Sequence, residues 1–422
     1  MEAALAMILA GGCAEWMGIL CRYRPKPLLP FAGSTRVIDF TLSNLIYSEL
    51  RDIAVLTDCQ RTTMAIYLRR WSFMNGNSDN IRVFEPKNGS YMGTADAVYR
   101  NLECVQNHGD DLVLVVAGDH IYKMHYQNML AFHRQRGTDA TVGVIPVPIE
   151  QSHRFGIITT GDNDRIIDFI EKPERPQSQL ASMGIYVFNK QLLFERLSED
   201  ATLTNSPHDF GHAILPDMVN RDKVYAYKFD SYWRDIGDPQ AYYEANMELL
   251  LPELSFSLDG IRPVLTAFKH LPQMPMSQQG SIENSVVSPG CTIKGRVKNS
   301  ILSPGVWVEE KAEIKNSIVM ANSCIGYHSV VDHCILDEGV HVDKFCYLGF
   351  ESSTIRDNRV VTLLGEGVTV PSLTAICRNC KILPHVGPSD FSGKVVASNS
   401  VVAPKRDHAL KIKEKGVLTN VG

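Results

Sequence analysis

Asp111-Leu-Val-Leu-Val-Val-Ala117, with Gly118-Asp119 directly after it, has the composition of a strand buried on both faces. Similar apolar runs occur at Leu5–Ala10, Ile53–Thr57 and Thr141–Pro146. Longer stretches with a helical pattern, such as Val37–Tyr47, lie between these runs. The alternation predicts an α/β fold with a mainly parallel, Rossmann-like sheet and helices on both faces. Ligands of such sheets gather at the carboxyl ends of the strands, where Gly118-Asp119 stands.

The size and charge of the chain narrow the classes of function. Its 422 residues are too many for one ordinary core, so we expect two or three domains. The net charge of −5 argues against general nucleic-acid binding. No apolar run approaches the ~20 residues that span a bilayer, so we expect no membrane partner. Met1–Ala10 lacks the basic flank of a signal peptide, and ten cysteines are too sparse for a disulfide scaffold, so we expect a cytoplasmic protein.

The spacing of apolar residues changes after a proline-containing stretch at 251–280. From Ile282 onward, apolar residues recur at five- to six-residue steps, separated by turns such as Ser288-Pro-Gly290. That spacing does not fit a helix and is typical of a parallel β-helix with stacked coils. The pattern weakens near Lys344–Asn358, which predicts a bulged or broken coil. We therefore expect an α/β domain at 1–250, a linker at 251–280 and a β-helix at 281–422.

A β-helix leaves apolar ends that need covering. The preceding domain could cap one end, and a second subunit could cover the side. We therefore expect a homo-oligomer.

Two strand ends carry groups suited to phosphate chemistry. The first run ends in Gly11-Gly12, where backbone N–H groups can approach a phosphate, and Lys26 follows between two prolines. The alternative is a tight turn after a buried strand. Asp119 is well placed for a divalent ion that bridges phosphates. Its alternative role is to cap the N-terminus of a helix.

A third group of candidates is spread along the sequence and combines carboxylates, hydroxyls and aromatic rings, as a sugar site requires. Lys172 could contact a sugar phosphate, and Asp235 could share a metal ion with Asp119. Taken singly, each residue could equally be a solvated surface group or a core residue. The group comprises Glu171, Lys172, Ser182, Tyr186, Asp209, Trp233 and Asp235.

A series of short motifs runs along the chain in a fixed order. The motifs are Leu9-Ala-Gly-Gly12, Arg24-Pro-Lys-Pro27, Ile38-Asp-Phe-Thr-Leu-Ser-Asn44, Gly93-Thr-Ala-Asp-Ala97, Ala117-Gly-Asp-His-Ile-Tyr-Lys123, Phe169-Ile-Glu-Lys-Pro173, Ala181-Ser-Met-Gly-Ile-Tyr-Val-Phe188 and Tyr232-Trp-Arg-Asp-Ile-Gly237. Their order resembles that of the ADP-glucose pyrophosphorylases, also called glucose-1-phosphate adenylyltransferases. The resemblance covers essentially the whole chain.

The resemblance implies a nucleotidyltransferase domain followed by a left-handed β-helix. It also implies a reaction of ATP with glucose 1-phosphate that gives ADP-glucose and pyrophosphate, uses Mg²⁺ and serves glycogen or α-glucan synthesis. It further implies a tetramer under allosteric control. Regulatory subunits of the family suggest an alternative, in which the chain binds sugar phosphate and modulates a catalytic paralogue in a hetero-oligomer.

The resemblance also assigns roles to individual residues. Lys26 and Asp119 would be catalytic, and Asp119 and Asp235 would hold the metal. The glucose 1-phosphate pocket would consist of Tyr91, Gly156, Glu171, Lys172, Ser182, Tyr186, Asp209 and Trp233. The nucleotide would contact Leu9, Ala10, Gly11, Gly12, Gly93 and Asp96.

This chain departs from the family in the glycine-rich loop. The family pattern is Gly-Gly-x-Gly-x-Arg-Leu, and here Ala14 replaces the third glycine and Trp16 replaces the arginine. Loss of one charge-assisted contact to pyrophosphate removes roughly 1.5–3 kcal/mol, or about 10- to 200-fold in rate. Either Arg22 or Arg24 could supply the missing charge. Tyr23 stands where many bacterial members carry a lysine linked to sugar-phosphate activators.

Overall fold

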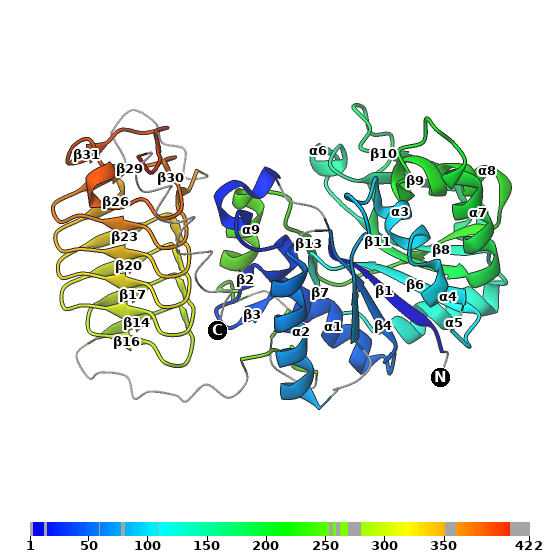
Figure 1. Cartoon of the computed structure of the whole chain (residues 1–422), viewed down its shortest axis with the longest axis horizontal. Coiled ribbons are helices and arrows are strands. Elements are labelled where there is room, and N and C mark those ends of the chain that lie inside the picture. The colour runs from blue at the N-terminus through cyan, green and yellow to red at the C-terminus, as the bar shows by residue number, and fades with distance from the viewer. Residues whose placement is uncertain are drawn as a thin grey trace.

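The computed structural model of the chain describes residues 3–11, 15–58, 60–76, 81–106, 108–252, 256–258, 262–268, 280–350 and 360–405. An α/β domain and a β-helix lie side by side (Figure 1). The described helices outside the β-helix are α1 Val37–Tyr47, α2 Arg61–Asn75, α3 Thr94–Tyr99, α4 Leu102–Gln106, α5 Tyr126–Arg136, α6 Ile149–Ser152, α7 Lys190–Ala201, α8 Leu215–Arg221 and α9 Pro239–Glu248. Shorter 3₁₀ or π turns occur at Glu15–Cys21, Lys26–Leu28, Asp162–Asp164 and Phe210–Ile214.

The α/β domain is built on a sheet that is parallel on one side and mixed on the other. Its main path runs β10-β9-β11-β6-β1-β4-β5. These strands are β10 Ile166–Glu171, β9 Gly156–Thr160, β11 Leu180–Asn189, β6 Leu112–Ala117, β1 Leu5–Leu9, β4 Ile53–Leu56 and β5 Ile81–Phe84. From β6 to β5 every pair is parallel. The predicted Rossmann-like arrangement is therefore confirmed.

At the long strand β11 the pairing in the sheet changes from parallel to antiparallel. It runs antiparallel to β6, to β9 and to β8 (Ala140–Pro146), and β8 in turn pairs in parallel with β12 (Val224–Lys228). A register shift between Ser182 and Tyr186 interrupts its pairing with β8. The motif at 181–188 does not by itself indicate a strand, so the antiparallel course of β11 is a finding of the structure.

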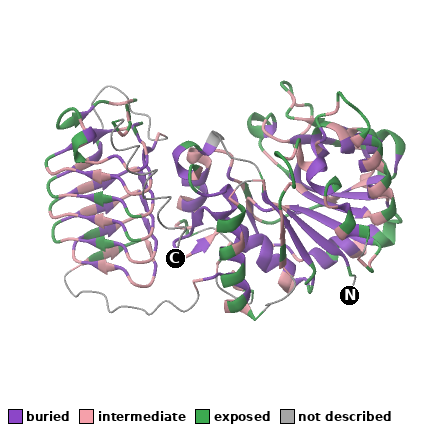
Figure 2. Cartoon of the chain, in the orientation of Figure 1, coloured by how far each residue is buried: buried purple, intermediate pink, exposed green. Residues whose placement is uncertain are grey.

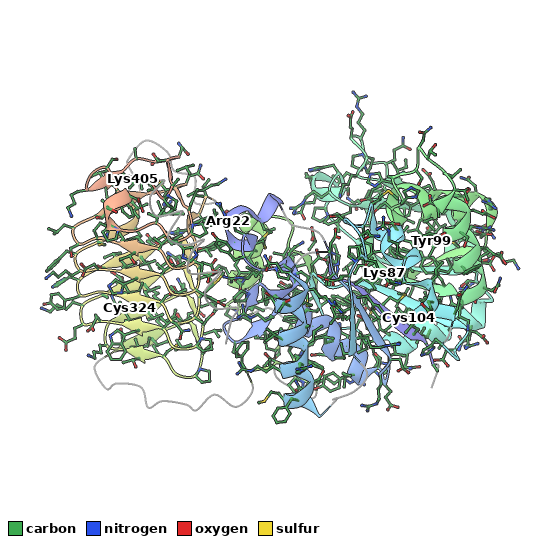
Figure 3. The ribbon with its side chains drawn as sticks, in the orientation of Figure 1. Arg22, Lys87, Tyr99, Cys104, Cys324 and Lys405 are labelled. Carbon is green, nitrogen blue, oxygen red and sulfur yellow. The ribbon has the colours of Figure 1, made fainter. Side chains whose placement is uncertain are left out.

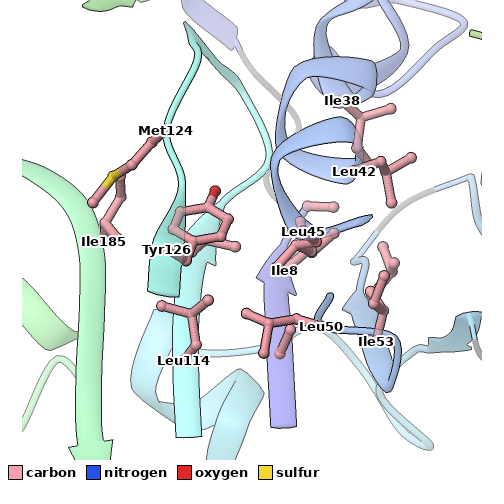
Figure 4. Packing of buried hydrophobic residues seen from close by; sticks show 14 of the residues in the cluster. Ile8, Ile38, Leu42, Leu45, Leu50, Ile53, Leu114, Met124, Tyr126 and Ile185 are labelled. Carbon is pink, nitrogen blue, oxygen red and sulfur yellow. The ribbon is translucent and has the colours of Figure 1, made fainter. Parts of the chain in front are cut away.

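Alternate residues of the central strands pack against helices on opposite faces. On β1, Ala6 and Ile8 belong to the cluster with α1, α2 and α5, whereas Leu5 and Met7 belong to the cluster with α3, α4, α7 and α8. Figure 4 shows Ile8 of β1 beside Leu45 of α1, and Leu114 of β6 below Tyr126 of α5. Both faces are thus buried, which explains why these strands read as continuous apolar runs (Figure 2).

The C-terminal part is a left-handed β-helix of three parallel sheets, as predicted. The first sheet holds β14 Ser281–Glu283, β17 Arg296–Lys298, β20 Glu313–Lys315, β23 Val330–Asp332, β26 Tyr347–Phe350, β29 Ala375–Cys377 and β31 Val395–Val396. The second holds β15 Val286–Val287, β18 Ile301–Leu302, β21 Ile318–Val319, β24 Cys334–Leu336, β27 Thr362–Leu364, β30 Lys381–Ile382 and β32 Val401–Val402. The third holds β16 Thr292–Ile293, β19 Trp307–Val308, β22 Cys324–Ile325, β25 His341–Val342 and β28 Thr369–Val370.

The α/β domain covers the side of the β-helix, and the expectation that it caps an end is wrong. Ile318, Ile335 and Leu363 come from stacked strands of the second sheet, and they share one apolar cluster with residues of the α/β domain. Those residues include Leu20 and Phe31. Because the contact crosses several coils, it joins the two parts along a broad face.

The chain between α9 and β14 is described at 249–252, 256–258, 262–268 and 280. At its described positions it binds the α/β domain, since Trp71 Nε1 donates to Leu265 O at 3.1 Å and Leu265 N donates to Ser43 Oγ at 2.8 Å. None of the helices in the described ranges has the length and apolar character that a bilayer crossing needs.

Candidate functional site

Lys26, Asp119 and Asp235 converge on one point at the carboxyl edge of the sheet. Lys26 Nζ lies 2.8 Å from Asp119 Oδ2 and 3.4 Å from Asp235 Oδ1. We call these three residues and the adjacent His120 the acid–lysine cluster. The contacts join positions 93 and 209 residues apart in the sequence, so tertiary structure alone creates the cluster.

The strands and turns that carry Asp119, Asp235 and Lys26 place their side chains at this point. Asp119 follows β6 and precedes β7 (His120–Tyr122), and β7 pairs antiparallel with β13 (Trp233–Asp235) so that Asp235 lies opposite His120. The expected alternative, in which Asp119 caps a helix, is therefore wrong because a strand follows it. Lys26 starts a short 3₁₀ turn between Pro25 and Pro27, whose rings restrict the backbone on either side.

The electrostatics of the cluster keep Lys26 and Asp119 charged. Burial acts to lower the pKa of Lys26, but the carboxylates of Asp119 and Asp235 outweigh it and raise that pKa. Burial likewise acts to raise the pKa of Asp119, but the charge of Lys26, the neighbouring His120 and the hydrogen bonds to the carboxylate together outweigh it and lower that pKa to about 2. The lysine is therefore cationic and Asp119 anionic at neutral pH.

Two further residues at the cluster were not predicted as site residues. His120 Nδ1 lies 3.1 Å from Met183 O, and a carbonyl oxygen can only accept, so Nδ1 carries the proton. His120 Nε2 is then 3.6 Å from both Asp119 Oδ1 and Asp235 Oδ1. Arg154 Nη2 stands 3.9 Å from Asp235 Oδ2. The Gly-Asp-His motif could have identified His120 as a site residue. For Arg154, the sequence offered no indication other than its position before Phe155-Gly156.

The donors of the cluster fit the Mg²⁺ that the resemblance implies. Mg²⁺ is commonly held by one or two carboxylates with waters and substrate phosphates as the other ligands. Asp119 and Asp235 already turn one oxygen each toward the same point. Among the described residues no group of three or more His, Cys, Asp or Glu side chains forms a complete metal site.

A second group of predicted residues surrounds Glu171 at the end of β10. Gly156 pairs with Glu171 across β9 and β10. A Cβ atom at Gly156 or at Gly211 would stand within 2.7 Å of Glu171 Oε2, so both positions leave room for this carboxylate. Lys172 Nζ lies 3.6 Å from Glu171 Oε1 and is otherwise exposed. Glycine is required at these positions because a carboxylate occupies the space of the side chain.

Asp209 completes this Glu171 cluster from the other side. Its Oδ1 accepts from Gly211 N and His212 N, and its Oδ2 accepts from Thr94 Oγ1 at 2.8 Å. Burial acts to raise the pKa of Asp209, but these donors lower it overall. Burial raises the pKa of Glu171 despite the nearby Lys172. The cluster therefore holds two carboxylates of different acidity, with the more basic one beside the exposed lysine.

The bulge in β11 connects the two clusters. Ser182 Oγ lies 3.4 Å from the hydroxyl of Tyr186, whose buried ring contacts Phe210. Between them, Gly184 has a φ of 65° and would place a Cβ 3.4 Å from His120 Cε1. The same short segment of β11 therefore contacts His120 of the acid–lysine cluster and carries two residues of the predicted sugar pocket.

Trp233 packs its ring edge-on against His120 and Phe155, with ring centroids 5.2 and 5.4 Å away. Its Nε1 is buried without a hydrogen-bond partner among the described residues. Trp233 also lines a cavity of about 270 Å³ together with Arg154 and Asp235. An unpartnered buried donor beside a cavity is a place where a polar ligand would gain a hydrogen bond.

The residues predicted to contact the nucleotide lie along the start of α3 and the end of β1. A Cβ at Gly93 would meet His208 O at 2.4 Å, so α3 can begin here only with glycine. Asp96 is used locally, since Oδ2 accepts from Met92 N and Oδ1 from Arg100 Nε. Tyr91 donates its backbone N–H to Asp58 Oδ1.

The glycine-rich loop is only partly described. Leu9 ends β1, Ala10 is buried and Gly11 is exposed. Gly12, Cys13 and Ala14 lie outside the described residues, and so does the side chain of Trp16.

The two arginines expected to replace the missing loop charge are placed differently. Arg22 is exposed, and Figure 3 shows it on the side of the α/β domain that faces the β-helix. Arg24 is buried, and its Nη2 lies 2.6 Å from Asp337 Oδ1 of the β-helix. Arg24 therefore cannot serve a phosphate in this conformation.

Comparison with known proteins places the chain in a family. A nucleotidyl transferase family model matches residues 5–251, and a GlmU-like C-terminal hexapeptide model matches residues 270–370. A protein named glucose-1-phosphate adenylyltransferase from Thermomicrobium roseum is 39% identical over 96% of this chain and 98% of its own length. Namesakes from Acetivibrio thermocellus and Fervidobacterium nodosum are 37% and 36% identical over 92% and 95% of this chain and 94% and 98% of their own lengths.

These relatives span both the α/β domain and the β-helix. The chain belongs to the glucose-1-phosphate adenylyltransferase family of nucleotidyltransferases.

Proposed function

We propose that this chain transfers the adenylyl group of ATP to glucose 1-phosphate, releasing pyrophosphate and forming ADP-glucose for glycogen or another α-glucan. A phosphate oxygen of the sugar attacks the α-phosphorus of ATP, and the bond from that phosphorus to the pyrophosphate oxygen breaks. No covalent enzyme intermediate is needed, so the protein contributes position and charge.

The observation that carries the proposal is the convergence of Lys26, Asp119 and Asp235 beside a pocket of sugar-binding character. The Lys26 ammonium lies where it can neutralise a phosphate once the substrates displace the carboxylates from it. The Trp233 indole N–H would orient a ligand in the adjacent cavity. The Glu171 cluster offers carboxylates for the sugar hydroxyls and, in Lys172, an exposed cation for the sugar phosphate.

Mg²⁺ is part of the proposal. Asp119 and Asp235 would hold it, and when bound it would neutralise charge on the phosphates of ATP and pyrophosphate. The chain's own residues then orient the sugar and keep the two acids at one point, where Arg154 and His120 contact the second of them.

The test is pyrophosphate release by the purified chain from ATP, glucose 1-phosphate and Mg²⁺. We expect turnover that requires all three, with ATP preferred over other nucleoside triphosphates. The control is the Asp119→Asn variant, assayed at the same concentration. Turnover no greater than that of the control would reject the proposal.

The altered loop motivates a second candidate, in which the chain binds glucose 1-phosphate and modulates a catalytic paralogue in a hetero-oligomer. Ala14 and Trp16 support it, because the family arginine is absent. In that case the wild-type chain would be inactive but would bind glucose 1-phosphate by calorimetry. The double variant Trp16→Arg/Ala14→Gly would then gain turnover.

We further propose that the active form is a homotetramer, as the family resemblance implies. Sedimentation or light scattering of the purified chain measures its size directly. A monomer that turns over substrate at full rate would contradict this part of the proposal.

A further inference from the structure

The segment that carries Lys26 is attached to the β-helix on both of its sides. Before Lys26, Arg24 Nη2 contacts Asp337 Oδ1 at 2.6 Å. After Lys26, Leu28 O accepts from Arg36 Nη1 at 3.0 Å, and Arg36 Nη2 contacts Glu338 Oε1 at 2.8 Å. Asp337 and Glu338 are consecutive residues of the β-helix. Two adjacent acids of one domain thus hold the lysine segment of the other.

The first of these contacts is buried and therefore hard to break. The side chains of Arg24 and Asp337 are 8% and 1% exposed. Glu338 and Glu366 also approach the Arg24 guanidinium, at 3.8 Å each. Removing one partner from a buried ion pair leaves an uncompensated charge, which is strongly destabilising. Arg24 therefore stays at the domain interface as long as Asp337 is there.

The backbone between Arg24 and Lys26 transmits this constraint. Two residues span at most ~7 Å, and Pro25 and Pro27 fix φ on either side of Lys26. Two turn hydrogen bonds stiffen the segment further, from Leu28 N to Pro25 O and from Leu29 N to Lys26 O. A displacement of Arg24 or Leu28 would therefore move Lys26 away from Asp119, whose Oδ2 is 2.8 Å from Nζ.

We infer that Asp337 and Glu338 of the β-helix are positioning residues, which hold the Lys26 segment in place through Arg24 and Arg36. The role of Lys26 itself rests on the proposed function, but the attachment of its segment does not. The β-helix is then part of the working site and does more than support the α/β domain.

The test uses the full chain with the double substitution Asp337→Asn/Glu338→Gln, which keeps side-chain size and removes both charges. The matched control is Asp332→Asn/Glu309→Gln. It removes two β-helix carboxylates whose hydrogen bonds and ion pairs lie within the β-helix, with Lys294, Trp307, Lys315, Asn316 and His333.

The first measurement is amide hydrogen exchange in peptides that cover residues 22–31. We expect the N–H groups of Leu28 and Leu29 to exchange about 10-fold faster in the test variant than in the control, because their turn loosens. Unchanged exchange would overturn the inference. This measurement needs no turnover, so it stands even if the chain proves inactive and the proposed function fails.

The second measurement is steady-state kinetics. In an active chain we expect the test variant to lose about 10- to 100-fold in kcat, because a small misplacement of a catalytic group is costly. The KM for glucose 1-phosphate should stay within about 2-fold, because the Glu171 cluster is untouched. A kcat equal to that of the control, or a kcat loss with a matching rise in KM, would overturn the positioning role.

A variant that fails to fold would be replaced by the single substitution Glu338→Gln. The Glu338 side chain is 29% exposed, and its loss removes the attachment that follows Lys26 while the Arg24–Asp337 pair remains. Faster exchange at Leu29 would support the inference, and unchanged exchange at this position would contradict it.

Discussion

The α/β domain and the β-helix satisfy their buried polar groups by different means. In the β-helix, Ser300 N donates to Ser285 Oγ, Ser317 N to Ser300 Oγ and Cys334 N to Ser317 Oγ, each bond joining one coil to the next. In the α/β domain, some buried polar groups find partners that occur once and lie far apart in the sequence. Lys26 with Asp119 and Tyr67 with Asp39 are examples.

Because of this difference, we expect the loss of a single bond to have different consequences in the two parts. A repeated bond can be lost at one coil while its neighbours remain, as in other solenoids, where each repeat contacts only the next. A bond that occurs once, between distant segments, has no such replacement. The catalytic candidates all lie in the part of the molecule built from unique contacts.

The largest loss of activity is expected when a residue of the acid–lysine cluster is replaced. Asp235→Asn should lower pyrophosphate release by about 100- to 1000-fold, because it removes the charge that faces Lys26 and the proposed metal. The melting temperature should change little. The matched control is Asp168→Asn, an exposed acid on β10. Activity retained in Asp235→Asn would show that the two acids do not act together.

The stability of the α/β domain should depend on pH because the domain buries an acid at its centre. Asp39 accepts from Tyr67 OH at 2.6 Å and from Arg36 N at 2.9 Å, yet burial raises its pKa to about 7. The folded state then binds the proton more tightly than the unfolded state. The contribution of Asp39 to stability is greatest at pH 4 and falls as the pH rises to 7.

Asp39→Asn should remove this slope. The difference in unfolding free energy between variant and wild type, measured in urea from pH 4 to pH 8, should shift in favour of the variant as the pH rises. A difference that stays constant over this range would contradict the raised pKa.

A smaller loss of stability is expected when one of the serine hydroxyls that bond one coil to the next is removed. Ser317 is fully buried, donates to Lys315 O at 2.7 Å and accepts from Cys334 N at 3.1 Å. Ser317→Ala leaves that N–H without a partner and should cost about 1–3 kcal/mol of unfolding free energy. Ser285→Ala removes the same pair of bonds at the half-buried first coil, where water can replace them. Equal losses in the two variants would argue against burial as the cause.

The smallest loss of stability is expected at the asparagines of the β-helix turns, which have positive φ. Asn299 adopts a φ of 44° and accepts from Asn284 Nδ2 at 2.9 Å. Alanine tolerates this left-handed backbone less well, so Asn299→Ala should cost about 1 kcal/mol. Asn299→Gly should cost less, because glycine adopts positive φ freely. Thermal unfolding of both variants measures the difference, and the reverse order would rule out backbone strain.

Activity should distinguish these substitutions as well. Ser317→Ala and Asn299→Ala should leave kcat unchanged at temperatures where the chain is folded, because neither residue contacts Asp337 or Glu338. A lowered kcat in either variant would show that the coils influence the active site beyond those two acids.

The sequence alone was sufficient for features that depend on neighbouring residues. The runs at Leu5–Ala10, Ile53–Thr57 and Asp111–Ala117 form β1, β4 and β6, and Val37–Tyr47 forms α1. The five- to six-residue spacing correctly predicted the β-helix. These succeed because burial on a strand face, on a helix face or in a coil leaves a periodic trace in the residues themselves.

Only the tertiary structure determined which distant residues meet. The family resemblance grouped Lys26, Asp119 and Asp235, but no spacing in the sequence places Lys26 Nζ at 2.8 and 3.4 Å from the two carboxylates. Nothing in the sequence pointed to Arg154 or to the burial of Arg24 against Asp337. The antiparallel course of β11 was also not predicted. Contacts between segments hundreds of residues apart depend on how the sheet pairs and how the two domains pack, and such contacts leave no periodic pattern in the sequence.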